Sequence, residues 1–387
     1  MQSVSVFTQV VDSKAAGEEL AARIRAGFEG APDAILLFAA PTYDHGALLE
    51  TLQAAFPRCV IVGASSAGEF VGTTVVEGAA TALALGGEDV KFAAGVGRNL
   101  RSDPASAARQ IAASFGSDPE AAFPHRAALV LTDALAGYTD AVVDELTVAT
   151  GGQYRFVGGG AGDNAQFQQT RVFGGTEVLT DAAVALEVLS QRPIGIGLSH
   201  GWVPASEPLR VTESDGLRLV SLNGLPALDA FEAHAQAQGQ HFDPSSPLPY
   251  FLHNVLGIDV GSGYRLRVPL AVLPDGSVHC AAEVPAGSQV RFMRSSAQSA
   301  ADAAERATTA AIDALDGAQP GAALLFDCVA TRLRLGDSFK LELKSVVDKL
   351  GGVPLVGCNT HGQIGRAEGQ FAGFHNCTAV VCLFPAE

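Results

Sequence analysis

Three glycine-rich turns carry most of the polar residues that could bind a ligand. Residues 62–70 read VGASSAGEF, residues 356–364 read VGCNTHGQI, and residues 157–163 read the looser VGGGAGD. Glycine turns let a ligand approach the backbone closely and can present N–H groups to an anion. The candidate ligand-binding residues at these turns are Ser65, Glu69, Asp163, Asn164, His361 and Gln363. If the surrounding segments pack with pseudo-symmetry, the three turns converge on one site.

A purely structural role is the alternative for each turn, because glycine also permits positive φ in tight turns. The sequence has no GxxxxGK[ST] phosphate loop. The GGGAGD run resembles a dinucleotide fingerprint, but a strand-like segment follows it where that fingerprint needs a helix. The turns therefore give little support for a nucleotide site.

A second set of candidates lies in the run CVATRLRLG, residues 328–336, which follows an apolar strand. Arg332 suits a carboxylate ligand, because its guanidinium matches two oxygens; pairing with one of the 41 acidic residues is the alternative. Cys328 is a candidate nucleophile, but no GxSxG elbow is present and no spacing fixes a histidine partner. The sequence lacks the HExxH motif that would indicate metal-dependent hydrolysis.

Repeated elements position these residues. Apolar strand-like runs at residues 34–40, 127–133 and 322–328 are each followed by a helix-like segment, a second strand, the glycine turn and another apolar strand. Continuous apolar strands that alternate with helices predict sheets covered on both faces. We expect parallel pairing inside each unit and an antiparallel neighbour after the turn, which gives an α/β fold with mixed sheets.

The segment from about residue 209 to residue 315 has a different pattern. Turn signals at Ser214-Asp215-Gly216 and Pro274-Asp275-Gly276 predict hairpins, and an Ala-rich run with serine at its start predicts a helix. We place a boundary near Glu207. The predicted domains are residues 1–207 and an α+β domain of residues 208–387, which includes the third unit.

Composition excludes several classes of protein. The 387 residues carry 25 basic and 41 acidic side chains and a net charge of -16, which argues against nucleic-acid binding. No apolar run approaches the roughly 18 residues of a membrane span, and the N-terminus does not resemble a secretory signal. The six scattered cysteines predict reduced thiols and a cytoplasmic location.

The order of the motifs resembles the FIST-domain family. Six segments follow one another as in that family: GASSAGEF, FVGGGAGDN, NGLPALDAF, residues 328–336, GCNTHGQIG, and FHNCTAVV, which contains the candidate ligand-binding residue Asn376. The resemblance covers an N-terminal part near residues 30–207 and a C-terminal part near residues 220–367. His361 stands where the family often has a bulkier aromatic residue, and Gln363 replaces the usual glutamate.

The resemblance implies a small-ligand sensor that is not an enzyme and that signals through a separate histidine kinase or cyclic-di-GMP enzyme. Stand-alone bacterial members of this length resemble NosP, the nitric-oxide-sensing hemoproteins. Non-covalent heme needs one axial ligand in an apolar pocket, and the candidates are His241, His253 and His234, in that order. His234 and His241 share a helix face only if their helix extends that far.

Two other functions stay open. The same fold could sense an amino acid or another small carboxylate, held by Arg332 and the amides of the turns. The other hypothesis comes from a different class of protein: a cysteine-dependent enzyme that uses Cys328 as its nucleophile. Oligomeric state is also open: sensors often form homodimers, but no heptad run is present.

Overall fold

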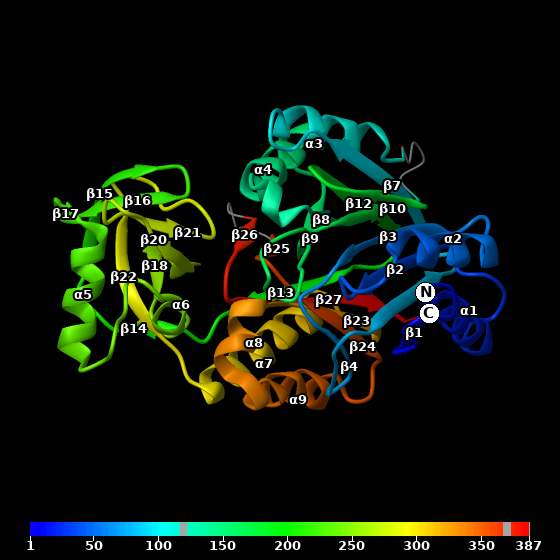
Figure 1. The fold of residues 1–387 in the computed structure, drawn as a ribbon. Helices are drawn as coiled ribbons and strands as arrows, with labels where there is room; N and C mark the ends of the chain where they lie inside the picture. The colour runs from blue at the N-terminus through cyan, green and yellow to red at the C-terminus, as the bar shows by residue number, and fades with distance from the viewer. Residues whose placement is uncertain (117–121, 367–372, 387) are drawn as a thin grey trace.

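The body of the protein is built from three units with one element order: strand, helix, strand, helix, strand, hairpin, strand. The computed structural model describes residues 1–116, 122–366 and 373–386. A smaller sheet formed by residues 203–294, called here the small domain, is inserted into the third unit and stands apart at the left of Figure 1. The termini lie side by side on the opposite side of the body.

The bounds of the elements show the repetition. The first unit comprises β1 (Gln2–Thr8), α1 (Ser13–Gly27), β2 (Ala34–Ala39), α2 (His45–Ala55), β3 (Val60–Ser65), the hairpin β4 (Glu69–Val71) and β5 (Thr74–Val76), and β6 (Ala80–Gly86). The second comprises β7 (Val90–Arg98), α3 (Pro104–Ala113), β8 (His125–Thr132), the 3-10 turn η1 (Ala134–Ala136), α4 (Thr139–Ala149), β9 (Arg155–Gly160), the hairpin β10 (Val172–Gly174) and β11 (Glu177–Leu179), and β12 (Ala182–Ser190). The third comprises β13 (Gly195–Ser199), α7 (Ala297–Asp313), β23 (Pro320–Cys328), α8 (Val329–Leu335), η2 (Gly336–Ser338), α9 (Phe339–Leu350), β24 (Leu355–Thr360), the hairpin β25 (Gln363–Gly365) and β26 (Phe374–His375), and β27 (Ala379–Pro385).

Strand pairing inside the units confirms the predicted mixed α/β fold. β2 pairs in parallel with β3, as β8 does with β9 and β23 with β24. The antiparallel neighbours are β6, β12 and β27. Every residue of β2 and of β6 is buried, because helices cover one face and the other units cover the second.

The hairpin of each unit completes the sheet of another unit. β10–β11 adds to β3 of the first unit, β25–β26 adds to β9 of the second, and β4–β5 adds to β24 of the third. This cyclic exchange ties all three units together through backbone hydrogen bonds. The sequence pattern did not predict it, because a three-residue strand gives no signal of which sheet it joins.

The glycine after the valine in each motif makes this exchange possible. Gly63, Gly158 and Gly357 face Phe173, Ile364 and Phe70 of the incoming hairpins. A Cβ on Gly357 would lie 2.2 Å from the Phe70 ring and 2.2 Å from the carbonyl oxygen of Leu325. A side chain at this position would therefore exclude both the hairpin and the neighbouring strand.

The small domain is one sheet with two short helices. Its elements are β14 (Val203–Pro204), β15 (Leu209–Asp215), β16 (Arg218–Leu222), β17 (Leu225–Pro226), α5 (Ala227–Gln238), α6 (Leu248–Phe251), β18 (Val255–Asp259), β19 (Tyr264–Arg267), β20 (Pro269–Val272), β21 (Val278–Cys280) and β22 (Gln289–Arg294). The β15–β16 and β20–β21 hairpins confirm the two predicted turns. The Ala-rich helix is α7, whose place in the third unit matches that of α1 and α3 in the others.

The predicted domain boundary near Glu207 falls between β14 and β15, inside the small domain. β13, which precedes it, pairs with β27 at the C-terminal end of the chain. That this boundary separates two functional domains stays a prediction. In the described part of the chain, the helices are too short or too polar to cross a bilayer.

The exchanged hairpin gives a stability prediction. Phe70 is fully buried and packs edge-on against Phe339 at 5.9 Å between ring centroids. We expect Phe70→Ala to lower the free energy of unfolding by about 3–5 kcal/mol, because the ring leaves a cavity between two units. Chemical denaturation measures this, with Val11→Ala, a site that is 91% exposed, as the matched control. Equal stability of the two variants would contradict the proposed role of the hairpin.

Candidate functional site

The three glycine turns meet at the centre of the body, as the pseudo-symmetric arrangement requires. The Ala67 N–H donates to Asn359 O at 2.9 Å, and the Gly162 N–H donates to Ser65 O at 2.8 Å. The His361 N–H donates to Gly160 O at 3.0 Å, which closes the ring. The turn amides are thus largely used to bind the turns to one another.

Glu69 lies at this junction and is fully buried. Its carboxyl group accepts hydrogen bonds from the Ser66 hydroxyl and, at 3.3 Å, from the Ala79 N–H. Burial raises the pKa of Glu69 to about 7, although these hydrogen bonds and the charge of Arg332 oppose the shift. Glu69 lines neither cavity described below.

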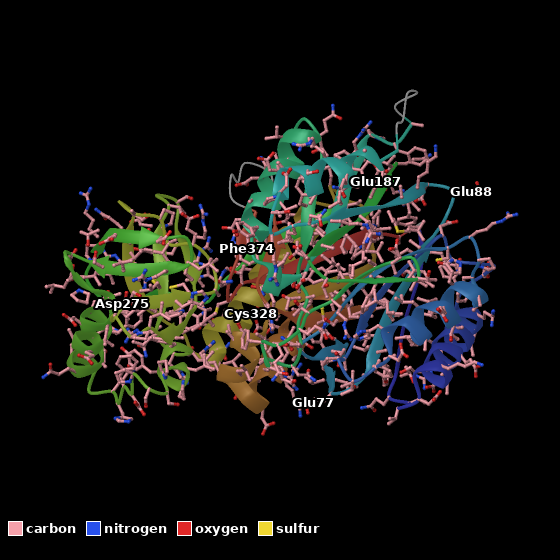
Figure 2. The ribbon with its side chains drawn as sticks, turned by 45° about the horizontal axis from the view of Figure 1, so that its top comes forward. Glu77, Glu88, Glu187, Asp275, Cys328 and Phe374 are labelled. Carbon is pink, nitrogen blue, oxygen red and sulfur yellow. The ribbon has the colours of Figure 1, made fainter. Side chains whose placement is uncertain are left out.

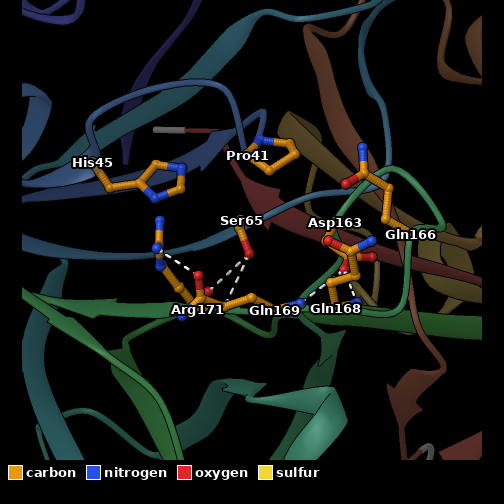
Figure 3. Close-up of a pocket in the computed structure, with 8 residues that line it drawn as sticks. All are labelled: Pro41, His45, Ser65, Asp163, Gln166, Gln168, Gln169 and Arg171. Carbon is orange, nitrogen blue, oxygen red and sulfur yellow. Dashed lines mark hydrogen bonds between the residues drawn. The ribbon is translucent and has the colours of Figure 1, made fainter.

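A polar cavity of about 180 Å³ opens between the first and second turns. Figure 3 shows Ser65 and Asp163 on its wall with His45 and Arg171. The Asp163 carboxylate accepts the N–H groups of residues 167–169 at 2.7–3.0 Å, and Ser65 Oγ accepts the Arg171 N–H at 2.9 Å. Both polar groups are therefore engaged in holding the loop, and the volume is below the range of most ligand pockets.

A larger cavity of about 700 Å³ lies between the small domain and the body, and we call it the interdomain cavity. Figure 2 shows Cys328 and Phe374, which both line it, where the small domain meets the body. Leucines from both sides line it, together with polar groups from both. The volume and the mixed lining are those of a small-molecule site.

His361 of the third turn lines this cavity and is the polar group in it that most needs a partner. Its side chain is 7% exposed, and neither ring nitrogen has a hydrogen-bond partner among the described residues. Asp163 Oδ1 is 3.7 Å from Nε2, and the Phe167 ring stacks on the imidazole at 4.7 Å. Burial lowers the pKa of His361 to about 4, so the ring is neutral at pH 7 and offers one donor and one acceptor.

Two arginines of β19 line the opposite wall. Arg267 is 1% exposed; its guanidinium donates to Glu283 O at 2.8 Å and pairs with Asp140 of α4 at 3.2 Å. This ion pair crosses from the small domain to the body. Arg265, two residues earlier on the same strand, also lines the cavity, and its buried Nε has no partner among the described residues.

Other predicted residues lie around the interdomain cavity without sharing one role. Cys328 ends β23 and lines the cavity, as does Asn376, whose Oδ1 accepts the Val268 N–H at 3.4 Å. Gln363 is buried and lines neither cavity, and its side-chain amide is 3.0 Å from Thr360 Oγ1. Asn164 is exposed with φ 55° and lines neither cavity.

Arg332 lies on α8, outside both cavities. Its guanidinium donates to Ala67 O and forms an ion pair with Glu77. A Cβ on Gly68 would lie 2.0 Å from Nη1, so this glycine leaves the room that the arginine occupies. The structure thus uses Arg332 to fasten α8 to the first glycine turn.

The three histidines proposed for heme lie in the small domain and line neither cavity. α5 ends at Gln238, where Gly239 has φ 63°, so His241 lies beyond the helix and is exposed. His253 is exposed as well, and His234 stacks on Phe292 at 4.2 Å inside the core of the small domain. These residues do not offer an axial ligand facing an apolar pocket, so they do not fit heme.

Sequence reasoning missed the small-domain side of the site. Arg265 and Arg267 alternate with apolar residues in YRLRV, which places both arginines on one face of a strand, and this spacing was a usable signal. Phe167 gave no such signal, because it stacks on His361 of a different unit. Phe374 gave none either, because its contact with Gly362 forms only once β25 pairs with β26.

Comparison with known proteins assigns the family. The chain consists of a body and an inserted small domain with a cavity between them, and two family models match it: the FIST N domain over residues 33–225 and the FIST C domain over residues 227–366. The chain belongs to the FIST family. FIST domains are sensor domains for small ligands in signalling proteins.

Relatives and solved structures add no established activity. An uncharacterized protein of Mycobacterium tuberculosis is 26% identical over 265 residues, which cover 67% of this chain and 68% of that protein. An uncharacterized protein of Mycobacterium bovis is 28% identical over 235 residues, 59% of this chain and 60% of its own length. A crystal structure of cyanuric acid hydrolase from A. caulinodans covers 100% of this chain and 99% of its own at 9% identity, with a TM-score of 0.35, from which we draw no inference.

Burial of Glu69 predicts a pH-dependent stability. The folded protein holds the Glu69 proton up to about pH 7, whereas the unfolded chain releases it near its ordinary pKa of 4.5. The stabilisation is therefore complete below 4.5 and is lost as pH rises towards 7, by up to about 1.4 kcal/mol per pH unit.

We expect Glu69→Gln to flatten this decline in denaturation experiments at a series of pH values. Glu88→Gln, at an exposed site, is the control and should keep the slope of the wild type. An unchanged slope in Glu69→Gln would show that this carboxyl group is ionised in the folded protein.

Proposed function

We propose that this protein senses a small carboxylate-bearing ligand in the interdomain cavity and passes the signal to a separate partner. The observation that carries the proposal is His361: a buried ring, with neither nitrogen partnered by a described residue, on the wall of a cavity of about 700 Å³. An unpaired buried polar group costs about 1–3 kcal/mol, and a ligand that hydrogen-bonds to it recovers that free energy.

A carboxylate is the favoured chemistry because the cavity combines a neutral imidazole with guanidinium groups. A neutral imidazole can donate one N–H to a carboxylate oxygen, and Arg265, which lines the cavity near Asp140 and Asp144, can donate to the other oxygen. Leu217, Leu252 and Leu270 provide an apolar surface for the remainder of the ligand. Amino acids and short organic acids combine these two properties.

The signal would arise from the relation between the small domain and the body. The two parts meet through the Arg267–Asp140 ion pair and through the contact of Val268 with Asn376, both at the cavity. A ligand that binds both walls favours the arrangement in which they are correctly spaced. The partner is a histidine kinase or a cyclic-di-GMP enzyme, by the family resemblance, and towards the carboxylate ligand the protein itself acts as a binding module rather than an enzyme.

We place the protein in the cytoplasm. The six cysteines are all free thiols, and each is buried, as expected where disulfides do not form. The oligomeric state of the protein also stays a prediction, and a homodimer is one arrangement.

Binding can be tested by thermal-shift screening with amino acids and small mono- and dicarboxylates. We expect at least one compound to raise the melting temperature, and His361→Ala to weaken its affinity about tenfold or more, because a buried hydrogen bond to a charged group is lost. His125→Ala, on β8 and outside both cavities, is the matched control. A hit whose affinity is the same in His361→Ala would move the ligand site away from this cavity.

Heme binding stays a prediction of the resemblance alone, and an absorption spectrum after addition of hemin tests it. From the positions of His234, His241 and His253, we expect no stoichiometric Soret band that depends on any of them. A Soret band that shifts with nitric oxide and disappears in an alanine variant of one of these histidines would contradict the fit described above.

A further inference from the structure

A second cysteine, Cys377, lies in the same apolar cluster as Cys328. Cys328 and Cys377 are 3% and 5% exposed and belong to one apolar cluster with Trp202 and Met293, where the small domain meets the body. Cys328 also lines the cavity itself. Cys377 has a left-handed backbone, with φ 49°.

The two thiols are electrostatically unequal. The Cys377 thiol donates a hydrogen bond to the Cys328 sulfur, and this interaction is the main reason that the pKa of Cys328 falls to about 6. Backbone groups of Cys377 and Ala330 add to the effect, while burial opposes it. The same hydrogen bond raises the pKa of Cys377. One sulfur is therefore a thiolate near neutral pH and its neighbour keeps a proton, which is the arrangement of an attacking and a resolving thiol.

The charged groups around the pair are Asp327, Glu342 and Arg334. Burial raises the pKa of Asp327 to about 7. Burial and the neighbouring charge of Asp327 raise the pKa of Glu342 well above its ordinary value. This carboxyl pair therefore holds a proton at neutral pH and adds less negative charge beside the Cys328 thiolate. Arg334 is 4.9 Å from the centre of the Trp202 ring and adds positive charge near Cys377.

The other cysteines lack this environment. Burial raises the pKa of Cys59, Cys280 and Cys382 to about 12, and it raises that of Cys358 as well. A reagent that reacts with thiolates should thus distinguish Cys328 from the rest of the described cysteines.

We propose that Cys328 and Cys377 form a redox-active dithiol that reduces organic hydroperoxides entering the interdomain cavity. The Cys328 thiolate attacks the outer peroxide oxygen, the O–O bond breaks, and the alkoxide takes a proton from solvent to leave as an alcohol. The Cys377 sulfur then attacks the resulting Cys328 sulfenic acid, the S–O bond breaks, and water leaves with the Cys377 proton. Two thiols and one hydroperoxide give one disulfide, one alcohol and one water.

The cavity accounts for the choice of an organic hydroperoxide. Its volume of about 700 Å³ and its leucine side chains accommodate an apolar body that hydrogen peroxide lacks. The inference shares the location of the proposed sensor site but does not depend on the carboxylate ligand, since the thiols react without it. A disulfide at this point would join β23 to the segment before β27 directly beneath the small domain.

The first experiment maps the oxidised cysteines. Reduced full-length protein is treated with one equivalent of cumene hydroperoxide, quenched, and digested for mass spectrometry. We expect a loss of two hydrogens and a peptide pair joined through Cys328 and Cys377. In Cys377→Ala the reaction should stop at a Cys328 sulfenic acid, which dimedone traps. In Cys328→Ser the rate of peroxide consumption should fall about tenfold or more. Cys382→Ala is the control and should behave as the wild type.

A second measurement separates a reactive thiol from one that is only accessible. Iodoacetamide labelling of Cys328 should be half-maximal near pH 6 in the wild type and shift to higher pH in Cys377→Ala, which loses the donor. Oxidation spread over several cysteines, or a Cys328 that labels only at alkaline pH, would overturn the proposal. Melting curves of each variant check folding. Ligand-induced thermal shifts in Cys328→Ser test the sensor site separately, so each proposal can fail without the other.

Discussion

The exchange of hairpins between the three units is the constraint on which the other features depend. Each sheet has a parallel pair at its centre, and the edge beside the second of these strands is completed only by a hairpin from another unit. The hairpin can approach because the facing residue is glycine, at Gly63, Gly158 or Gly357. A unit on its own would expose a strand edge that invites incorrect pairing. The three units are therefore interdependent, and the turns that lead into the hairpins are forced together.

Convergence of the turns explains why several polar residues are buried there without forming a ligand site of their own. Ser66 and the Ala79 amide satisfy Glu69, loop amides satisfy Asp163, and Ala67 with Glu77 engages Arg332. These contacts hold the turns in place. Two side chains of the third turn, Asn359 and His361, are left without a hydrogen-bond partner among the described residues, and of these two His361 lines the interdomain cavity.

Insertion of the small domain turns one side of this symmetric body into a site. The equivalent connection in the first two units is short, whereas in the third it holds residues 203–294. Only there do Arg265 and Arg267 share a cavity with a residue of a glycine turn and with Cys328, whose apolar cluster also contains Cys377. Ligand binding and thiol oxidation would act on the same contact between small domain and body, so the two proposals describe one region that could respond to two kinds of chemical signal.

The sequence by itself determined the local elements and the family. Apolar runs, helix starts and turn residues act over a few positions, so the strands of each unit, their parallel pairing and the two small-domain hairpins were predictable. The repeated VG motif also located the turns. Tertiary structure alone decided which sheet each hairpin joins, that Gly239 ends α5 before His241, and that Arg332 binds Ala67 and Glu77 instead of facing a cavity. These outcomes depend on contacts between residues as far apart as 265 positions, which no local pattern encodes.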